Sequence, residues 1–232
     1  MGLADVVLTG GDDVLDAYRK LLGPSVDGTW SLPNARLRVT AAPQNLVLVG
    51  VDDAASTTRL LTRRGLELDA IPDGLRARDL PVGITSSSVA PGSAGGDAGI
   101  VAVDHLVFFA ADRDHAVALF GATLGMDFRL AQSIPGVTDP EQAAAVTQLF
   151  FRDGELIIEV VAKSDVPEKI SFWGIAWRTE DLELSAQALR DNGFDVSEIR
   201  AGRKPGTRVC TVRDRTLAVA TLLIEHSRGA RT

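Results

Sequence analysis

The chain has 232 residues, a formal net charge of −7 and a sequence pI near 5.0. This acidic balance gives no electrostatic sign of binding to nucleic acid or to an anionic membrane surface. The apolar runs reach only strand length, short of the roughly 20 residues that cross a bilayer, and a single cysteine excludes an internal disulfide framework.

The first residues lack a basic segment followed by an apolar core, so we expect no signal peptide and a soluble, cytoplasmic protein. The one cysteine, Cys210, lies in a strand-like segment without an obvious histidine partner. A structural thiol is therefore favoured over a nucleophile.

The N-terminal part contains two similar blocks, each with a strand, a helix ended by glycine and further strands. In the first block, the helix is capped by Asp12 or Asp13 and ends at Gly23. Strands 5–9, 28–32 and 35–41 are predicted to accompany this helix in the first block. The second block is predicted to contain strand 45–49, helix 54–64, a strand that begins at 66, and strand 81–85.

The same order recurs twice after a stretch rich in serine, proline and glycine, which is typical of a linker. The third block predicts strand 101–109, a helix from Asp112 or Asp114 to Leu124, and strands 126–130, 145–152 and 155–162. The fourth predicts strands 171–177, 194–196, 207–212 and 216–225, and helix 182–192 capped by Asp181.

Four matched blocks indicate an internal repeat. Because antiparallel hairpins follow each helix, the predicted fold class is α+β rather than a doubly wound parallel sheet. One block is too small for its own core, so pairs must share one. We predict an N-terminal domain at 1–88, a linker at 89–99 and a C-terminal domain at 100–228.

Two polar residues stand within otherwise apolar strands, His105 and Glu159. Burying either of them is costly unless it is paired, hydrogen-bonded or bound to metal. Together they are a candidate acid–base pair or two metal ligands. The alternatives are a histidine hydrogen-bonded within the sheet and a solvated carboxylate at the rim of the site.

Other polar and aromatic residues are predicted to be structural. We expect His115 to be exposed and His226 to be solvated after the last strand, unless a shifted register brings His226 or Glu225 to the site. Trp173 and Trp177 share one strand face, where core packing is favoured over ligand stacking.

The segment Val103-Asp104-His105-Leu106-Val107, followed by Phe120-Gly121-Ala122-Thr123-Leu124-Gly125-Met126, resembles the opening of a vicinal oxygen chelate module. The segments Gly154–Val161 and Gly174–Leu182 resemble its fourth strand and the start of the next module. That superfamily includes glyoxalase, bleomycin-resistance proteins and extradiol dioxygenases. The resemblance implies four βαβββ modules in two glyoxalase-like domains with curled mixed or antiparallel sheets, the N-terminal domain being degenerate.

Metal-using members of the superfamily place ligands on the first and fourth strands of each module. By this resemblance, His105 and Glu159 are ligands, while the other two positions hold Gly174 and Leu222. The set is incomplete, so a divalent metal ion is expected to be weakly bound or absent. Gly174 would leave space for a larger ligand, and the residues implied to line the C-terminal cleft are Val103, Val107, Phe109, Ile157 and Gly174.

We therefore expect a protein that binds a small organic molecule in the C-terminal cleft, without a complete metal site. The alternatives are a metal-dependent lyase, isomerase or dioxygenase, and a non-catalytic scaffold with relic clefts. The predicted partner is a small-molecule ligand, without nucleic acid or membrane, and the chain is expected to be a monomer or a homodimer. The sequence identifies neither the ligand nor a reaction.

Overall fold

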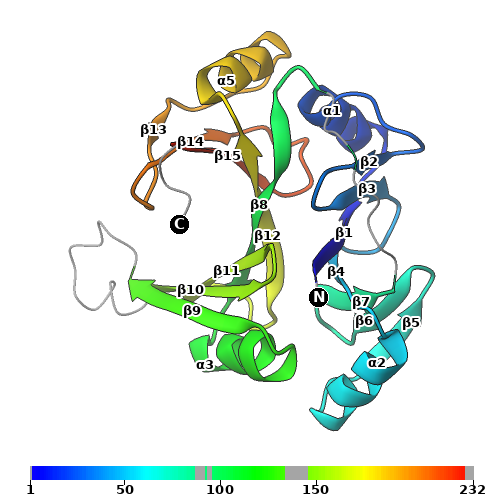
Figure 1. Cartoon of the computed structure of the whole chain (residues 1–232). Coiled ribbons are helices and arrows are strands. Elements are labelled where there is room, and N and C mark those ends of the chain that lie inside the picture. The colour runs from blue at the N-terminus through cyan, green and yellow to red at the C-terminus, as the bar shows by residue number, and fades with distance from the viewer. Residues whose placement is uncertain (1, 87–91, 93–95, 134–145, 228–232) are drawn as a thin grey trace. The chain divides into compact units, whose positions relative to one another are not determined.

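The computed structural model describes residues 2–86, 92, 96–133 and 146–227 (Figure 1). Most of the predicted linker 89–99 therefore lies outside the described residues, as does Ala145 at the start of a predicted strand. Within the described ranges, no helix is long and apolar enough to span a membrane.

The chain builds strands and helices in the repeating order that the sequence predicts. The N-terminal elements are β1 Gly2–Thr9, α1 Asp12–Leu22, β2 Thr29–Ser31, β3 Arg36–Thr40, β4 Leu46–Gly50, α2 Ala54–Arg63, β5 Leu68–Ile71, β6 Gly74–Ala77 and β7 Val82–Thr85. The C-terminal elements are β8 Ile100–Ala110, α3 Arg113–Ala116, η1 Val117–Thr123, β9 Asp127–Ser133, β10 Val146–Asp153, β11 Leu156–Lys163, β12 Ser171–Thr179, α5 Leu182–Asp191, β13 Arg200–Ala201, β14 Thr207–Val212 and β15 Ala220–His226.

The same pairing rule holds in all four blocks: the first strand of a block runs parallel to its last strand. The parallel pairs are β1 with β3, β4 with β7, β8 with β11 and β12 with β15, and the strands that follow each helix pair antiparallel. The result is two mixed sheets, in the orders β2-β3-β1-β4-β7-β6-β5 and β13-β14-β15-β12-β8-β11-β10-β9. The α+β class predicted from the sequence is confirmed.

The chain divides into two compact units, and each combines N-terminal with C-terminal segments. The first unit comprises Met1–Ala4, Leu46–Ser88 and His105–Trp173, and the second comprises Asp5–Asn45, Val89–Asp104 and Gly174–Thr232. Strands β1 and β8 each begin in one unit and continue into the other. The predicted domain boundaries, which follow the chain order, stay a prediction.

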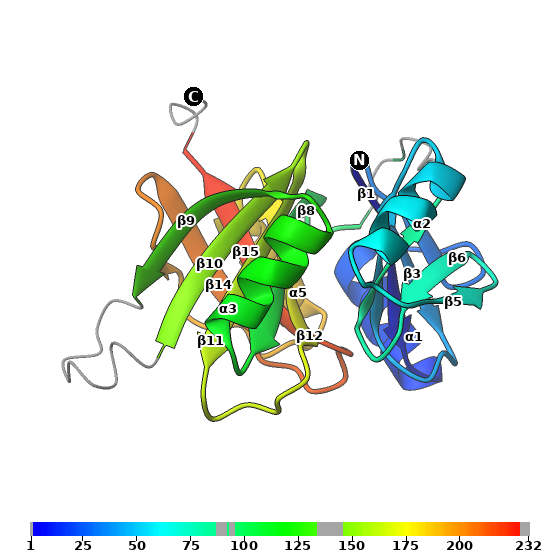
Figure 2. The same cartoon turned by 90° about the horizontal axis from the view of Figure 1, so that it is seen from below.

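In the first unit, α3 contacts β11, and η1 contacts β9 and β10 (Figure 2). Aromatic side chains form a continuous core in this unit. Phe108 is the centre of this core, with ring centroids 5.3 Å from both Phe120 and Phe172. Phe151 extends it, 5.5 Å from Phe120. Because Leu106, Phe108 and Ala110 are buried on one face of β8, the opposite face carries His105, Val107 and Phe109.

In the second unit, α1 and α5 bury their apolar stripes against strands. Tyr18 of α1 is fully buried and its ring lies 6.2 Å from that of Trp30. Helix α5 contacts β14 and β15 and buries Leu182, Ala186 and Leu189 (Figure 1).

Local predictions failed where backbone hydrogen bonds decide the structure. Gly11, rather than Asp12 or Asp13, is the N-cap of α1, and both aspartates lie in the first turn, where they offset the helix dipole. The helix after β8 continues as a π-helix, η1. The predicted strand 194–196 is reduced to one bridge between Val196 and Val212. On either side of it, the Ser197 N–H donates to the backbone oxygen of Thr211 and the Arg213 N–H donates to that of Asp195.

Candidate functional site

The candidate site lies in the first unit, where His105 on β8 faces Glu159 on β11. The parallel register pairs Glu159 with Val107, two residues beyond His105, so the two side chains are diagonal neighbours on one sheet face. His105 Nε2 lies 3.2 Å from Glu159 Oε2, and both side chains are largely buried, with 13% and 12% exposed. The predicted pair is thus formed.

Two glutamines extend this pair across the next two strands. Gln148 on β10 donates from Nε2 to Glu159 Oε1. Its own carbonyl Oε1 accepts from Gln132 Nε2 on β9 at 3.3 Å, and the two glutamines are register partners. A polar chain therefore crosses β9, β10, β11 and β8 on one face, and it engages both oxygens of the Glu159 carboxylate.

Gln148 was not among the site residues predicted from the sequence, although an amide side chain within an apolar strand is a signal of a buried polar contact. Gln148 is buried, 3% exposed, within a strand whose neighbours Leu149 and Phe151 are fully buried. A buried amide in an apolar strand needs hydrogen-bond partners. The partner itself could not be predicted, because it depends on the register between β10 and β11.

The site holds the Glu159 carboxylate and the His105 imidazole at hydrogen-bonding distance, with the apolar side chains of Val107 and Ile157 beside them. A carboxylate with one oxygen fixed by an amide donor and the other shared with histidine is oriented and need not reorganise when a ligand binds. Such a pair can accept a proton from a hydroxyl group, or from a carbon beside a carbonyl group, and can return it.

The donor set does not fit a complete protein metal site. Among the residues that the structure describes, no group of three or more His, Cys, Asp or Glu side chains is placed to hold a metal ion. His105 and Glu159 supply two donors, whereas about three protein ligands are usual. At Gly174, a Cβ atom would lie 2.8 Å from the backbone oxygen of Ala220, so no larger side chain fits without movement of β15.

The prediction that Gly174 leaves space for a larger ligand is therefore wrong, because the backbone of β15 fills the space beside this glycine. Gly174 and Val103 belong to the second unit. There the backbone N–H and C=O of Val103 bond the side chain of Asn34, at 3.1 and 2.8 Å.

The remaining predicted lining residues lie in the first unit with the pair. Val107 is the register partner of Glu159, and Phe109 is that of Val161. Ile157 is half-buried two residues before Glu159, so strand alternation places both on one face of β11.

Three other polar residues are found in structural environments. His115 is exposed, as predicted. His226 is not simply solvated, because its Nε2 lies 2.7 Å from Asp104 Oδ2. Glu225 Oε2 accepts from the backbone N–H of Leu182 at 2.8 Å and pairs with Arg208, so it caps α5.

Cys210 is fully buried, in agreement with a structural thiol, and burial raises its pKa.

The two tryptophans of β12 differ in environment. Trp177 is fully buried, which confirms the prediction of core packing. For Trp173 that prediction is wrong: 45% of the residue is exposed, and its ring lies 4.8 Å from that of Phe109.

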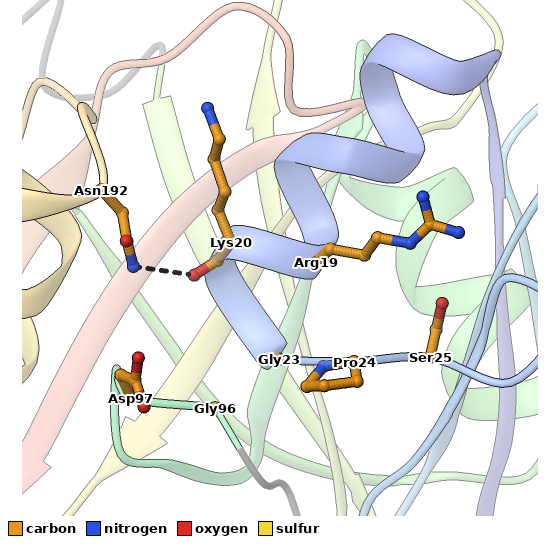
Figure 3. Close-up of a pocket in the computed structure, with 8 residues that line it drawn as sticks. All are labelled: Arg19, Lys20, Gly23, Pro24, Ser25, Gly96, Asp97 and Asn192. Atoms are coloured by element: carbon orange, nitrogen blue, oxygen red, sulfur yellow. Dashed lines mark hydrogen bonds between the residues drawn. The ribbon is translucent and has the colours of Figure 1, made fainter.

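A separate pocket occurs in the second unit at the C-terminal end of α1 (Figure 3). Asn192 Nδ2 donates to the backbone oxygen of Lys20 across its rim, at 3.4 Å. None of the site residues predicted from the sequence lines it; the lining residues are Arg19, Lys20, Gly23, Pro24, Ser25, Gly96, Asp97 and Asn192.

Comparison with known proteins agrees with the fold and the repeat. The family model described as Glyoxalase/Bleomycin resistance protein/Dioxygenase superfamily matches residues 104–211. The whole chain also superposes on a triple mutant of 4-hydroxymandelate synthase from Streptomyces coelicolor, with a TM-score of 0.73 and 14% identity over 94% of that chain. Residues 104–211, just under half of the chain, thus match this superfamily, and the whole chain shares the fold of the matched structure.

Two further solved structures share the fold over nearly the whole of this chain. One is 2,2′,3-trihydroxybiphenyl 1,2-dioxygenase from the dibenzofuran-degrading Sphingomonas wittichii strain RW1, with a TM-score of 0.63 and 14% identity over 97% of this chain and 90% of that one. Another is a fusion of a xylose isomerase-like TIM barrel with 4-hydroxyphenylpyruvate dioxygenase, with a TM-score of 0.70 and 12% identity, where this chain spans 49% of the fusion. At these identities the likeness concerns the fold alone. No curated protein matches the sequence.

Proposed function

We propose that this protein binds a small organic molecule on the β8–β11 face of the first unit, with the His105–Glu159 pair as its polar anchor. The observation that carries the proposal is the carboxylate of Glu159, which is held by Gln148 on one oxygen and by His105 on the other. A fixed, largely buried pair of this kind is costly to maintain without a purpose, because it must be desolvated.

The ligand class follows from what surrounds the pair. Val107 and Ile157 flank it on the same face, so the ligand combines an apolar body with a group that can donate a hydrogen bond or a proton to Glu159. Both a resistance-type binding protein and an enzyme that transfers a proton beside a carbonyl group fit this description. With two donors in place, either one works without a tightly held metal.

A metal-dependent lyase, isomerase or dioxygenase is the second candidate, since the fold is shared with dioxygenase structures. It requires at least one further ligand beyond His105 and Glu159. A non-catalytic scaffold is the third candidate, and it requires no ligand at all.

The location of the protein, its oligomeric state, its partners and its domain boundaries stay predictions. We infer a cytoplasmic monomer or homodimer that binds neither nucleic acid nor membrane, in keeping with the net charge of −7. The proposed domains are 1–88 and 100–228.

The test is a thermal-shift screen of chelator-treated protein against small organic acids, phenols and carbonyl compounds. A true ligand at about 100 times its dissociation constant adds roughly 2.7 kcal/mol to the free energy of unfolding. We expect the stabilisation to be lost in His105→Ala and in Glu159→Gln. The matched control is His115→Ala, which removes an exposed histidine from the same unit. In this variant the stabilisation by the ligand should be retained.

The outcomes separate the candidates. Stabilisation that survives both site variants would place the ligand elsewhere and refute the proposal. Exchange of a ligand C–H proton in D2O, followed by NMR and absent in Glu159→Gln, would identify an enzyme rather than a binding protein. Failure of the whole screen would favour the scaffold.

A further inference from the structure

Trp173 is unusual among the three tryptophans of the chain. Trp30 and Trp177 are 5% and 0% exposed, whereas Trp173 is 45% exposed. An indole ring contributes strongly to stability when it is buried, so an exposed one on a strand gives up much of that contribution. The Trp173 ring is nevertheless covered in part, because the Phe109 ring packs against it with centroids 4.8 Å apart and an interplanar angle of 32°.

A cation completes this aromatic platform, which we define as Phe109, Trp173 and Lys163. Lys163 Nζ lies 4.9 Å from the centroid of the Phe109 ring. Its carboxylate partner is Asp165, 3.3 Å away, whose side chain is 76% exposed. An ion pair with so exposed a partner contributes little, so the ammonium group can exchange Asp165 for an anionic group of a ligand.

The platform and the His105–Glu159 pair share one sheet face. His105, Val107 and Phe109 alternate along β8, and Glu159, Val161 and Lys163 alternate along β11 in the same direction. Phe109 follows His105 by four positions along β8, and Lys163 follows Glu159 by four positions along β11. At about 3.3 Å per residue, the pair and the platform are about 13 Å apart along the strands. Between them lie Val107 and Val161, which are buried and apolar.

We propose that the platform is a subsite for a planar aromatic anion, whose ring stacks on the exposed side of Trp173 and whose negative charge pairs with Lys163. The inference rests on the proposed function, because the other end of the same molecule reaches the His105–Glu159 pair across the valines. The ligand is therefore an elongated aromatic carboxylate with a hydrogen-bond donor at its far end. Neither a short aliphatic acid nor a neutral hydrocarbon satisfies both ends.

The probe is 6-hydroxy-2-naphthoate, measured against 2-naphthoate, which lacks the donor, and against the saturated decalin-2-carboxylate, which lacks the aromatic ring. Binding is followed by quenching of tryptophan fluorescence and, independently, by thermal shift. Since Trp173 is the exposed tryptophan, we expect quenching to disappear in Trp173→Leu. In that variant the dissociation constant, read by thermal shift, should rise about two- to ten-fold.

Two further variants separate stacking and charge from an effect on folding. Trp173→Phe should retain most of the affinity. Lys163→Met should raise the dissociation constant about two- to five-fold at low salt, a difference that shrinks when salt is added. The matched control is Leu184→Ser, which removes an exposed apolar side chain in the second unit and should change nothing.

Each outcome decides one claim. If Glu159→Gln abolishes binding while Trp173→Leu and Lys163→Met bind as the wild type does, the platform proposal is refuted and the proposed function stands. If the platform variants weaken binding and Glu159→Gln does not, the subsite stands and the role of the pair falls. No binding of any of the three compounds at millimolar concentration, or equal binding of the saturated acid, would overturn the aromatic subsite.

Discussion

At the residue scale, Gln148 decides how firmly the Glu159 carboxylate is held. Replacing it in Gln148→Leu leaves one carboxylate oxygen without its donor, in a position that is largely buried. The cost of such an unsatisfied group is about 1–3 kcal/mol, and we expect a loss of that size in the free energy of unfolding measured by urea denaturation. Gln187→Leu is the matched control, because this exposed glutamine lies on α5 and bonds the nearby Asp191. It should change the free energy of unfolding by less than about 0.5 kcal/mol. Equal stability of the two variants would show that the polar chain is not formed.

Cys210 gives a second residue-scale prediction, in which the pKa determines the rate of alkylation. Burial raises the pKa of the thiol, so the folded chain holds less thiolate than a free cysteine does at pH 8 to 9. We expect iodoacetamide to modify the native protein far more slowly than the urea-unfolded protein. The Cys210 thiol has a higher pKa in the folded chain than in the unfolded chain. Its contribution to the free energy of unfolding is therefore fully present below the unfolded-state pKa and is lost as the pH rises through the folded-state pKa. Rapid alkylation of the native chain would contradict burial.

At the scale of single elements, α5 is fixed at its start by two carboxylates from different parts of the chain. Asp181 accepts from the backbone N–H of Leu184 at 2.9 Å, and Glu225 accepts from that of Leu182. Removing the cap in Asp181→Ala should lower the free energy of unfolding by about 1 kcal/mol, as read from chemical denaturation. Asp191→Ala, at the other end of the same helix, removes no cap and should stay within about 0.5 kcal/mol of the wild type. A larger effect at Asp191 than at Asp181 would refute this account of the helix.

Elements were also the scale at which the sequence was most informative. The alternation of β8 and β11 places His105 and Glu159 on strands whose pairing brings them to 3.2 Å. Asp112 and Asp181, which the sequence places at helix starts, are the N-caps of their helices. The register between strands and the local backbone geometry could not be predicted from the sequence. The pattern of Val117–Thr123 is that of any amphipathic helix, so its π-helical bonds could not be inferred.

The misplaced residues share one cause. Glu225 was a candidate for the site because a register shift would turn it inward, yet it faces α5 and binds its first N–H group. Trp173 was expected in the core because apolar alternation predicts burial, yet it stacks on Phe109 and remains 45% exposed. In both cases the deciding neighbour is distant in sequence, so no local pattern could reveal it.

At the scale of the whole molecule, each compact unit joins residues from both ends of the chain. In the second unit, Asn34 binds the backbone of Val103 twice, and Asn45 Nδ2 donates to the backbone oxygen of Ala218 at 3.3 Å. We therefore expect calorimetry of the full chain to show one cooperative transition. Asn34→Ala should lower the melting temperature, since it leaves two backbone groups of β8 without these partners. Asn192→Ala, which loses one long bond of 3.4 Å, is the milder control. Two separate transitions, with only the first displaced by Asn34→Ala, would indicate that residues 1–88 and 100–228 fold independently.

In the proposed function, His105 and Glu159 form a ligand-binding pair without a complete metal site. Calorimetric titration of chelator-treated protein with Mn²⁺, Fe²⁺, Ni²⁺ and Zn²⁺, beside elemental analysis of the protein as purified, tests it most directly. Two donors predict weak binding at most, with no stoichiometric metal in the purified protein. One equivalent of tightly bound metal, lost in His105→Ala and kept in His115→Ala, would contradict the account and establish a metal centre with a ligand still to be found.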